Sequence, residues 1–183
     1  GIVKPGVPVV VAPQRREAME TIRRIADKRG CPLIGVEDAF SWQPRASGLD
    51  GQTFIVEGLK DTYEVSLPLI GDYQRENAAT AIATLETLID KGYKLSKTNV
   101  LAGLRSVRWP GRFQAVKRDG TNVIVDGAHN PYSMQCFVES LRKHIEFSHT
   151  VVVFGAISGH SAVGMLEELA VLDPTVVAVQ SRH

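Results

Sequence analysis

The spacing of apolar residues changes several times along the chain, and each change predicts a different element. Residues 7–11 form a continuous apolar, β-branched run, which predicts a buried strand, and residues 33–36 form a second short run. A helical stripe lies between them, made of Ala18, Ile22, Ile25 and Ala26. The order strand, helix, strand is typical of a parallel βαβ unit.

Residues 37–51 lose this periodicity and accumulate Pro, Gly and Ser, which predicts a surface loop. Residues 52–57 and 63–67 then alternate apolar and polar side chains, which predicts an antiparallel hairpin. A long helix should follow and end at Gly92, which is placed as a C-cap. The apolar stripe of this helix comprises Ala78, Ala81, Ile82, Leu85, Leu88 and Ile89. The stripe of the next helix comprises Val100, Leu101, Leu104 and Val107.

The helical pattern stops at Trp109-Pro110-Gly111, because Pro cannot continue a helix, and we place a boundary between two units here. Residues 113–117 and 122–125 flank Asp119-Gly120, a strong signal for a two-residue hairpin turn. A helix, a strand at 151–154, a helix and a strand at 176–179 should follow. The resulting fold class is α/β.

Composition sets the broad class. The chain has 183 residues, of which 44% are hydrophobic and 22% are charged, as in ordinary globular proteins, so one large domain or two small units are both open. A net charge of +1 without a basic run argues against a nucleic-acid partner. No apolar run could span a membrane and no signal peptide is visible, so we expect a cytoplasmic protein. Both ends look cut, and we expect a piece of a longer chain.

Candidate chemistry is densest at residues 126–131, Asp-Gly-Ala-His-Asn-Pro. A buried strand should end at Asp126, and a helix should begin with Asn130 as N-cap and Pro131 at its first position. Ligands of open parallel sheets collect at such strand ends, where helix N–H groups attract phosphate. The alternative is that Asp126 only orders the turn and His129 makes one structural hydrogen bond.

This stretch resembles the C-terminal domain signature of the folylpolyglutamate synthase and dihydrofolate synthase family, in the Mur ligase superfamily. Three other stretches resemble the same family in the same order: residues 1–10, residues 69–79 (Leu-Ile-Gly-Asp-Tyr-Gln-Arg-Glu-Asn-Ala-Ala) and residues 109–112 (Trp-Pro-Gly-Arg). Together the four cover nearly the whole chain. The resemblance implies that residues 1–108 end a central ATP-binding domain and that residues 109–183 begin a Rossmann-like glutamate ligase domain.

The resemblance also implies a reaction. ATP phosphorylates a substrate carboxylate, and the amino group of L-glutamate attacks the acyl phosphate; the acceptor is dihydropteroate or a folate. The residues that match ATP contacts of the family are Asn77, Arg112 and Asp126, and we add His129, which is close enough in the loop to approach the phosphates. Asn77 could equally cap its helix or face solvent, and Arg112 could be a surface residue. The implied parent enzyme is monomeric, uses small-molecule substrates and binds no membrane.

One expected sequence motif is absent. The chain has no G-x-x-x-x-G-K-[ST] phosphate loop, and the glycine-rich turn at residues 155–160 is not one. The resemblance implies that this loop and the Mg²⁺ ligands lie upstream of Gly1, so the chain alone should be inactive. Two alternatives stay open: a peptidoglycan-precursor Mur ligase, and a nucleotide-binding or scaffold module without catalysis.

Overall fold

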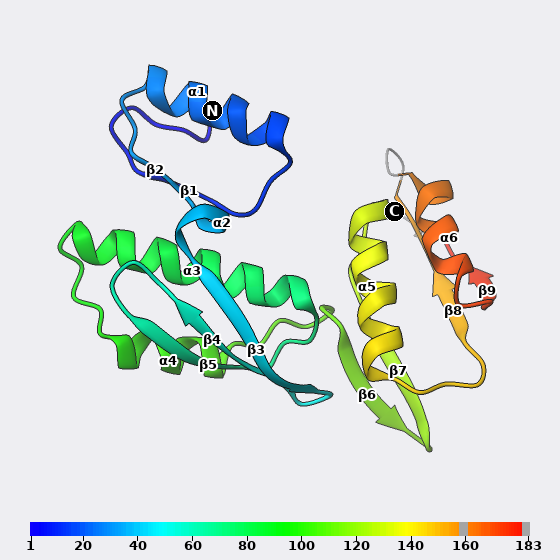
Figure 1. Ribbon diagram of the computed structural model, residues 1–183. Coiled ribbons are helices and arrows are strands. Elements are labelled where there is room, and N and C mark those ends of the chain that lie inside the picture. The colour runs from blue at the N-terminus through cyan, green and yellow to red at the C-terminus, as the bar shows by residue number, and fades with distance from the viewer. Residues whose placement is uncertain (158–160, 181–183) are drawn as a thin grey trace. The chain divides into compact units, whose positions relative to one another are not determined.

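The computed structural model describes residues 1–157 and 161–180, and the chain forms two compact units (Figure 1). The first unit comprises residues 1–69 and 73–108, and the second comprises residues 70–72 and 109–183. Both units mix helices with strands, so the chain is an α/β protein as predicted. No helix within the described ranges is long and apolar enough to cross a membrane.

The first unit begins with the predicted βαβ element. Strand β1 (Val9–Val11), helix α1 (Arg16–Lys28) and strand β2 (Leu33–Gly35) follow one another, and β1 pairs with β2 in parallel. Helix α1 ends where Gly30 adopts a φ of +62°, which lets the backbone N–H of Cys31 donate to the carbonyl of Ala26.

Residues 37–51 are not the surface loop that the sequence predicted. They contain most of helix α2 (Val36–Ala39) and all of strand β3 (Ser41–Gly48). Strand β3 lies at one edge of its sheet with nearly all of its side chains exposed, so it shows no alternating apolar pattern. The register shifts between Pro44 and Ala46, and a bulge on an edge strand is a position that tolerates proline.

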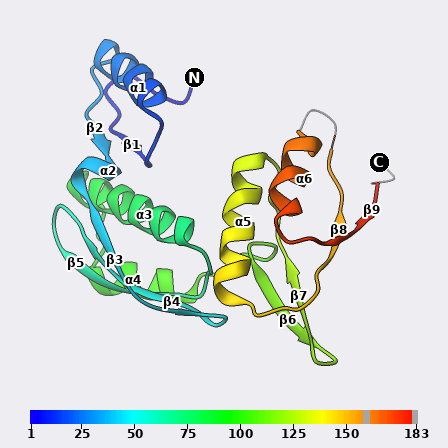
Figure 2. The same cartoon turned by 45° about the vertical axis from the view of Figure 1, so that its right-hand side comes forward.

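The predicted hairpin is confirmed as strands β4 (Gly51–Glu57) and β5 (Thr62–Leu67), which extend β3 into an antiparallel sheet. Helices α3 (Asp72–Asp90) and α4 (Lys97–Ser106) lie beside this sheet (Figure 2). Gly92 ends α3 with a φ of +91°, as predicted. The buried side chains that these elements share include Phe54, Val56, Tyr63, Val65, Leu67, Ala79, Ile82 and Val100.

The second unit begins with strands β6 (Gln114–Arg118) and β7 (Thr121–Val125), an antiparallel hairpin. Asp119 and Gly120 both have positive φ, which is the predicted two-residue turn. Helix α5 (Pro131–His144), strand β8 (Val151–Phe154), helix α6 (Ala162–Ala170) and strand β9 (Thr175–Ala178) follow, and β8 pairs with β9 in parallel. The core of this unit includes Phe113, Met134, Val138, Leu141, Met165 and Leu169.

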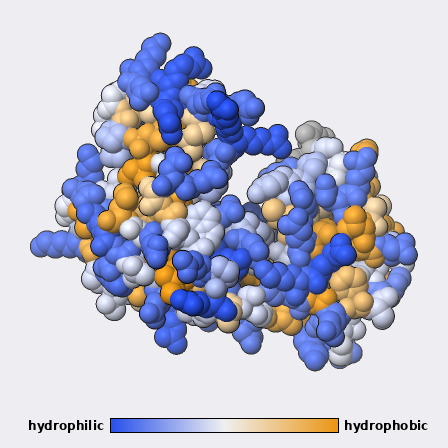
Figure 3. All heavy atoms as spheres, viewed as in Figure 1, coloured by the Kyte–Doolittle hydropathy of each residue, from blue (hydrophilic) through white to orange (hydrophobic). Residues whose placement is uncertain are grey.

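The prediction that β7 is buried is wrong. Val123 and Val125 are each more than 40% exposed, and among the described strands β7 pairs with β6 alone. Strand β8 is similar, since Val151 and Val153 are also exposed. A short β-branched run has the same sequence pattern whether one face or both faces are covered. Figure 3 shows apolar side chains reaching the viewed surface in both units.

Candidate functional site

The four predicted site residues are divided between the units. Asn77 belongs to the first unit, and Arg112, Asp126 and His129 belong to the second. Within the second unit, the turn before β6 and the loop between β7 and α5 are joined through Asp126 and through Arg112, so these two segments meet. We call residues 109–113 the arginine turn and residues 126–130 the aspartate loop.

Asp126 joins the two segments through its carboxylate. One oxygen accepts a hydrogen bond from the backbone N–H of Phe113, and the other accepts from that of Ala128, each at 2.7 Å. Such short bonds to an ionised acceptor are the strong kind. Asp126 therefore does order the turn, as the structural alternative proposed. A carboxylate has about four lone-pair positions, however, so two backbone bonds leave acceptor capacity for a ligand hydroxyl.

Phe113 anchors the arginine turn, and sequence reasoning missed it. Its side chain is 1% exposed, with its ring centroid 5.7 Å from that of Phe137 and 6.4 Å from that of His144. Its φ is +41°, a region that residues with a side chain seldom adopt. Burial of the ring and the bond from its N–H to Asp126 hold it there. The only available signal was an apolar residue directly after Arg112.

Arg112 is half-buried between the two segments. Its guanidinium carbon lies 5.5 Å from the ring centroid of Trp109, a cation–π arrangement. On the aspartate loop, Nη1 lies where a side chain at Gly127 would begin: a Cβ built there would be 2.6 Å from Nη1. A planar guanidinium held in this way can present paired N–H donors to an oxyanion.

The aspartate loop leads into α5 as predicted. Asn130 is the N-cap, its side chain accepts from the backbone N–H of Ser133 at 2.8 Å, and Pro131 occupies the first helical position. The backbone N–H of His129 donates to the Ser133 hydroxyl, and His129 Nδ1 lies 3.2 Å from the carbonyl oxygen of Gly127. A carbonyl can only accept, so this contact requires the proton on Nδ1.

Asn77 is an exposed residue within α3 rather than a cap of that helix. Its amide nitrogen donates to the side chain of buried Gln74 at 3.1 Å, which fixes the orientation of the amide. Its neighbour Arg75 is buried and donates to Gln52, and Gln52 donates to the carbonyl of Leu69. Sequence reasoning missed this chain of bonds, because residues 23 positions apart carry no pattern that links them.

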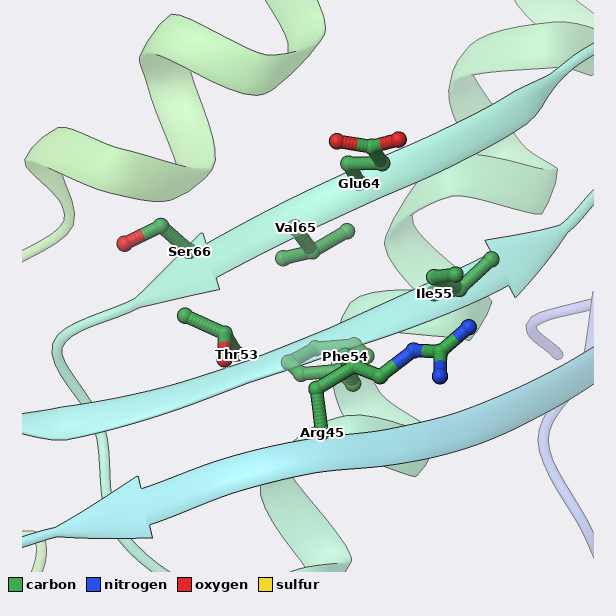
Figure 4. A pocket seen from close by; sticks show the side chains of 7 residues that line it. All are labelled: Arg45, Thr53, Phe54, Ile55, Glu64, Val65 and Ser66. Carbon is green, nitrogen blue, oxygen red and sulfur yellow. The ribbon is translucent and has the colours of Figure 1, made fainter.

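A separate hollow of about 420 Å³ lies on the outer face of the three-stranded sheet (Figure 4). One residue from the bulge of β3 and several from β4 and β5 line it: Arg45, Thr53, Phe54, Ile55, Glu64, Val65 and Ser66. None of the four predicted site residues is among them. In Figure 4 the Arg45 side chain extends over β4 toward Ile55.

Two groups with shifted pKa values lie in the first unit, outside the candidate site. Burial, and then the hydrogen bond to Glu86, raise the pKa of Tyr63. The hydrogen bond from Lys97 lowers the pKa of the exposed Asp61 carboxyl. Glu86 is itself buried and accepts from Tyr63 and from the backbone N–H groups of Leu59 and Lys60, so it closes the turn between β4 and β5. These groups serve structure rather than the candidate site.

Comparison with known proteins identifies the chain. Residues 111–181 match the model of the Mur ligase glutamate ligase domain. The dihydrofolate synthase/folylpolyglutamate synthase of Bacillus subtilis is 30% identical over 171 residues, which cover 92% of this chain and 40% of that protein. The structure of Mycobacterium tuberculosis folylpolyglutamate synthase complexed with ADP matches with a TM-score of 0.86 at 27% identity, over 97% of this chain and 39% of that one. The chain belongs to the folylpolyglutamate synthase family of Mur ligases.

This folylpolyglutamate synthase-family chain spans about 40% of the length of these relatives. The chain also resembles a UDP-N-acetylmuramoyl-L-alanyl-D-glutamate--2,6-diaminopimelate ligase of Zymomonas mobilis, which is 32% identical over 145 residues, 76% of this chain and 29% of that protein. The family predicted from the four stretches is thus confirmed. The individual roles of Asn77, Arg112, Asp126 and His129 stay predictions, and residues 158–160 of the glycine-rich turn lie outside the described residues.

Proposed function

We propose that the whole protein is an ATP-dependent ligase that adds L-glutamate to dihydropteroate or to folates. The observation that carries this proposal is the match of nearly the whole chain to a relative complexed with ADP, together with the matched glutamate ligase domain. The relatives are named dihydrofolate synthase and folylpolyglutamate synthase, and these names favour dihydropteroate and folates as the acceptors.

The proposed reaction has two steps. The acceptor carboxylate attacks the γ-phosphorus of ATP, the bond to the β-phosphate oxygen breaks, and ADP leaves. The amino nitrogen of glutamate then attacks the acyl carbon, phosphate departs with the electron pair of the C–O bond, and the nitrogen loses a proton. Negative charge builds up on phosphate oxygens in both steps, so fixed cationic donors would lower the barriers.

The roles proposed for this chain follow from the side-chain chemistry. Arg112 would bind phosphate oxygens through two parallel donors. Asp126 would accept ribose hydroxyls with the lone pairs that its backbone bonds leave over. Asn77, with its amide oriented by Gln74, would contact the nucleotide. His129 would contribute a polar contact near the phosphates.

Mg²⁺ accompanies ATP in the proposed reaction, and no residue of this chain is proposed as its ligand. Across the described residues, no group of three or more His, Cys, Asp or Glu side chains could hold a metal ion. Mg²⁺ in such enzymes is held by one or two carboxylates and by the phosphates themselves. We therefore assign no step to the metal through the residues of this chain.

The test is a steady-state assay of the whole protein with ATP, glutamate and either dihydropteroate or tetrahydrofolate. Arg112→Ala and Asp126→Ala should each lower kcat/KM for ATP about ten- to a hundred-fold, which corresponds to roughly 1.5 to 3 kcal/mol for a lost charge-assisted bond. Arg118→Ala is the matched control, because Arg118 is an exposed arginine of the neighbouring strand. Wild-type ATP kinetics in the Arg112 or Asp126 variant would remove that residue from the site.

The acceptor decides between the candidate functions. Because the Zymomonas mobilis relative acts on a different acceptor, the same assay should include a UDP-N-acetylmuramoyl dipeptide. Turnover with that acceptor and none with pteroate compounds would make the protein a peptidoglycan-precursor ligase. Nucleotide binding without turnover on any acceptor would favour the non-catalytic module. The 183-residue chain alone should release no phosphate, because it lacks a phosphate-binding loop.

A further inference from the structure

We propose that Gly127 and Trp109 are positioning residues for Arg112, and that the missing side chain of Gly127 is what gives the guanidinium its place. This inference rests on the proposed function, in which Arg112 binds the nucleotide. It assigns a role to two residues that make no proposed contact with ATP themselves.

Gly127 leaves room for one specific group. The three atoms nearest to a Cβ built at this position are Arg112 Nη1 at 2.6 Å, the Gly111 carbonyl oxygen at 3.4 Å and Arg112 Cζ at 3.6 Å. The first distance is far inside van der Waals contact, and the second is ordinary contact. Gly127 is not among the glycines with positive φ, so its backbone does not require glycine. An alanine there would therefore displace the end of Arg112 and leave the fold intact.

Trp109 restrains the guanidinium through its ring. The side chain of Trp109 is more than half exposed, and its ring lies 5.5 Å from the guanidinium carbon of Arg112. An exposed tryptophan adds little to the core, but its ring face attracts a cation and limits the rotamers of a long flexible side chain. If the Arg112 side chain were unrestrained, it would lose rotamer freedom on binding a ligand, and this loss of entropy would oppose binding.

The backbone beneath Arg112 is fixed independently. Phe113 is buried in the core and donates its N–H to Asp126, so the base of the arginine side chain is tied to the aspartate loop. Trp109 and Gly127 then act on the free end of the same side chain. Base and end are restrained by different residues, and changes at the end should leave folding almost unaffected.

The first measurement follows the guanidinium directly in the 183-residue chain. The Arg112 Nε–H signal in a ¹⁵N NMR spectrum, assigned by its loss in Arg112→Ala, should carry a ring-current shift that Trp109→Ala abolishes and Trp109→Phe largely keeps. Gly127→Ala should move this signal as well. Gly103→Ala is the matched control, because a Cβ at this helical glycine meets nothing within 4 Å. An Arg112 signal unmoved by Gly127→Ala would overturn the proposal.

The second measurement is ATP kinetics in the whole protein. Gly127→Ala should raise KM for ATP about ten-fold, Trp109→Ala about two- to five-fold, and Trp109→Phe and Gly103→Ala less than two-fold. In an Arg112→Ala background, Gly127→Ala should have no further effect, because its target is gone. Effects that multiply in the double variant would show that Gly127 acts without Arg112, and would overturn the positioning role.

Failure of the proposed function looks different. If Arg112→Ala itself keeps wild-type ATP kinetics, the assignment of Arg112 to the nucleotide is wrong, and the positioning role falls with it. If Arg112→Ala impairs ATP use and Gly127→Ala does not, the proposed function stands and only the inference about Gly127 and Trp109 is overturned.

Discussion

The two units hold their charged side chains in different ways. In the first unit, Glu86 and Arg75 are buried, and their bonds tie strands, turns and helix together from the inside. In the second unit, Arg112 and Asp126 are only half-buried and lie in turns beside the core. The first arrangement stabilises the fold, and the second leaves polar groups where a ligand can reach them.

The two groups described above with shifted pKa values, Asp61 and Tyr63, lie outside the candidate site. Tyr63 has a strongly raised pKa because it is buried and bonded to Glu86. Both residues close a turn and have no place in the proposed chemistry. Perturbed pKa values mark functional sites only in a probabilistic sense, because structural networks produce them too. In the second unit the informative features are steric: a missing Cβ at Gly127 and a positive φ at Phe113.

The largest expected effect tests the interior arrangement. Glu86→Ala leaves the N–H groups of Leu59 and Lys60 and the Tyr63 hydroxyl without their acceptor, so the free energy of unfolding should fall by about 3 kcal/mol or more. Urea denaturation measures it. Glu64→Ala, on the exposed face of β5, should change stability by less than about 0.5 kcal/mol. Equal effects of the two variants would end the distinction between buried and surface carboxylates.

The next effect tests whether the aspartate loop is held by its own backbone bonds. Asp126→Ala removes two bonds of 2.7 Å, so this loop should be destabilised by roughly 2 kcal/mol, more than a plain surface substitution. Hydrogen exchange of the Phe113 and Ala128 amides should accelerate by about thirty-fold. Unchanged exchange at both amides would mean that Asp126 serves the ligand alone.

A smaller effect concerns Tyr63 and alkaline pH. The pKa of Tyr63 is raised in the folded state. Its contribution to the free energy of unfolding is therefore fully present below the unfolded-state pKa of about 10, and it is lost as pH rises toward the folded-state pKa. Tyr63→Phe should lower the free energy of unfolding by about 1 kcal/mol at pH 7 and flatten the loss of stability above about pH 10. Tyr93→Phe, at an exposed tyrosine, is the control for denaturation at both pH values.

The smallest effect is expected at Asp61, an exposed carboxylate of the first unit. Lys97 lowers the pKa of this exposed carboxyl, so any stability it confers is present above about pH 4 and is lost as pH falls through the folded pKa. Lys97→Ala should raise the Asp61 pKa, measured by carboxyl ¹³C NMR, with little change in stability. Addition of 1 M salt should reduce the difference in Asp61 pKa between the wild type and Lys97→Ala. A pKa difference that does not depend on salt would contradict surface screening.

The sequence predicted most elements because their signals are local. The caps at Gly92 and Asn130 and the Asp119-Gly120 turn depend on residues within a few positions of one another, and all three are confirmed. Strand β3 was missed because an exposed edge strand with a bulge has no alternation. The exposure of β7 was also missed, because burial depends on which distant elements cover a strand.

For the candidate site, only the candidate side chains themselves could be proposed from the sequence. Asp126 and His129 follow a strand and precede a helix cap, and Arg112 follows a Pro-Gly pair, so each has a local signal. The contacts that restrain these side chains have no local sequence signal. No sequence rule predicts a positive φ at Phe113, or that the guanidinium of Arg112 occupies the space at Gly127, since both arise from packing between segments about 15 residues apart.

The positive φ of Phe113 also bears on how this protein can change over evolution. Arg112 is one peptide bond away from a ring enclosed by Phe137 and His144, so its position depends on the volume of the core. Substitutions on α5 that enlarge or shrink that space would shift the arginine even where the fold tolerates them. With the role proposed for Arg112, core positions in this unit should drift more slowly than their contribution to stability alone would require, and laboratory selection for thermostability should avoid them.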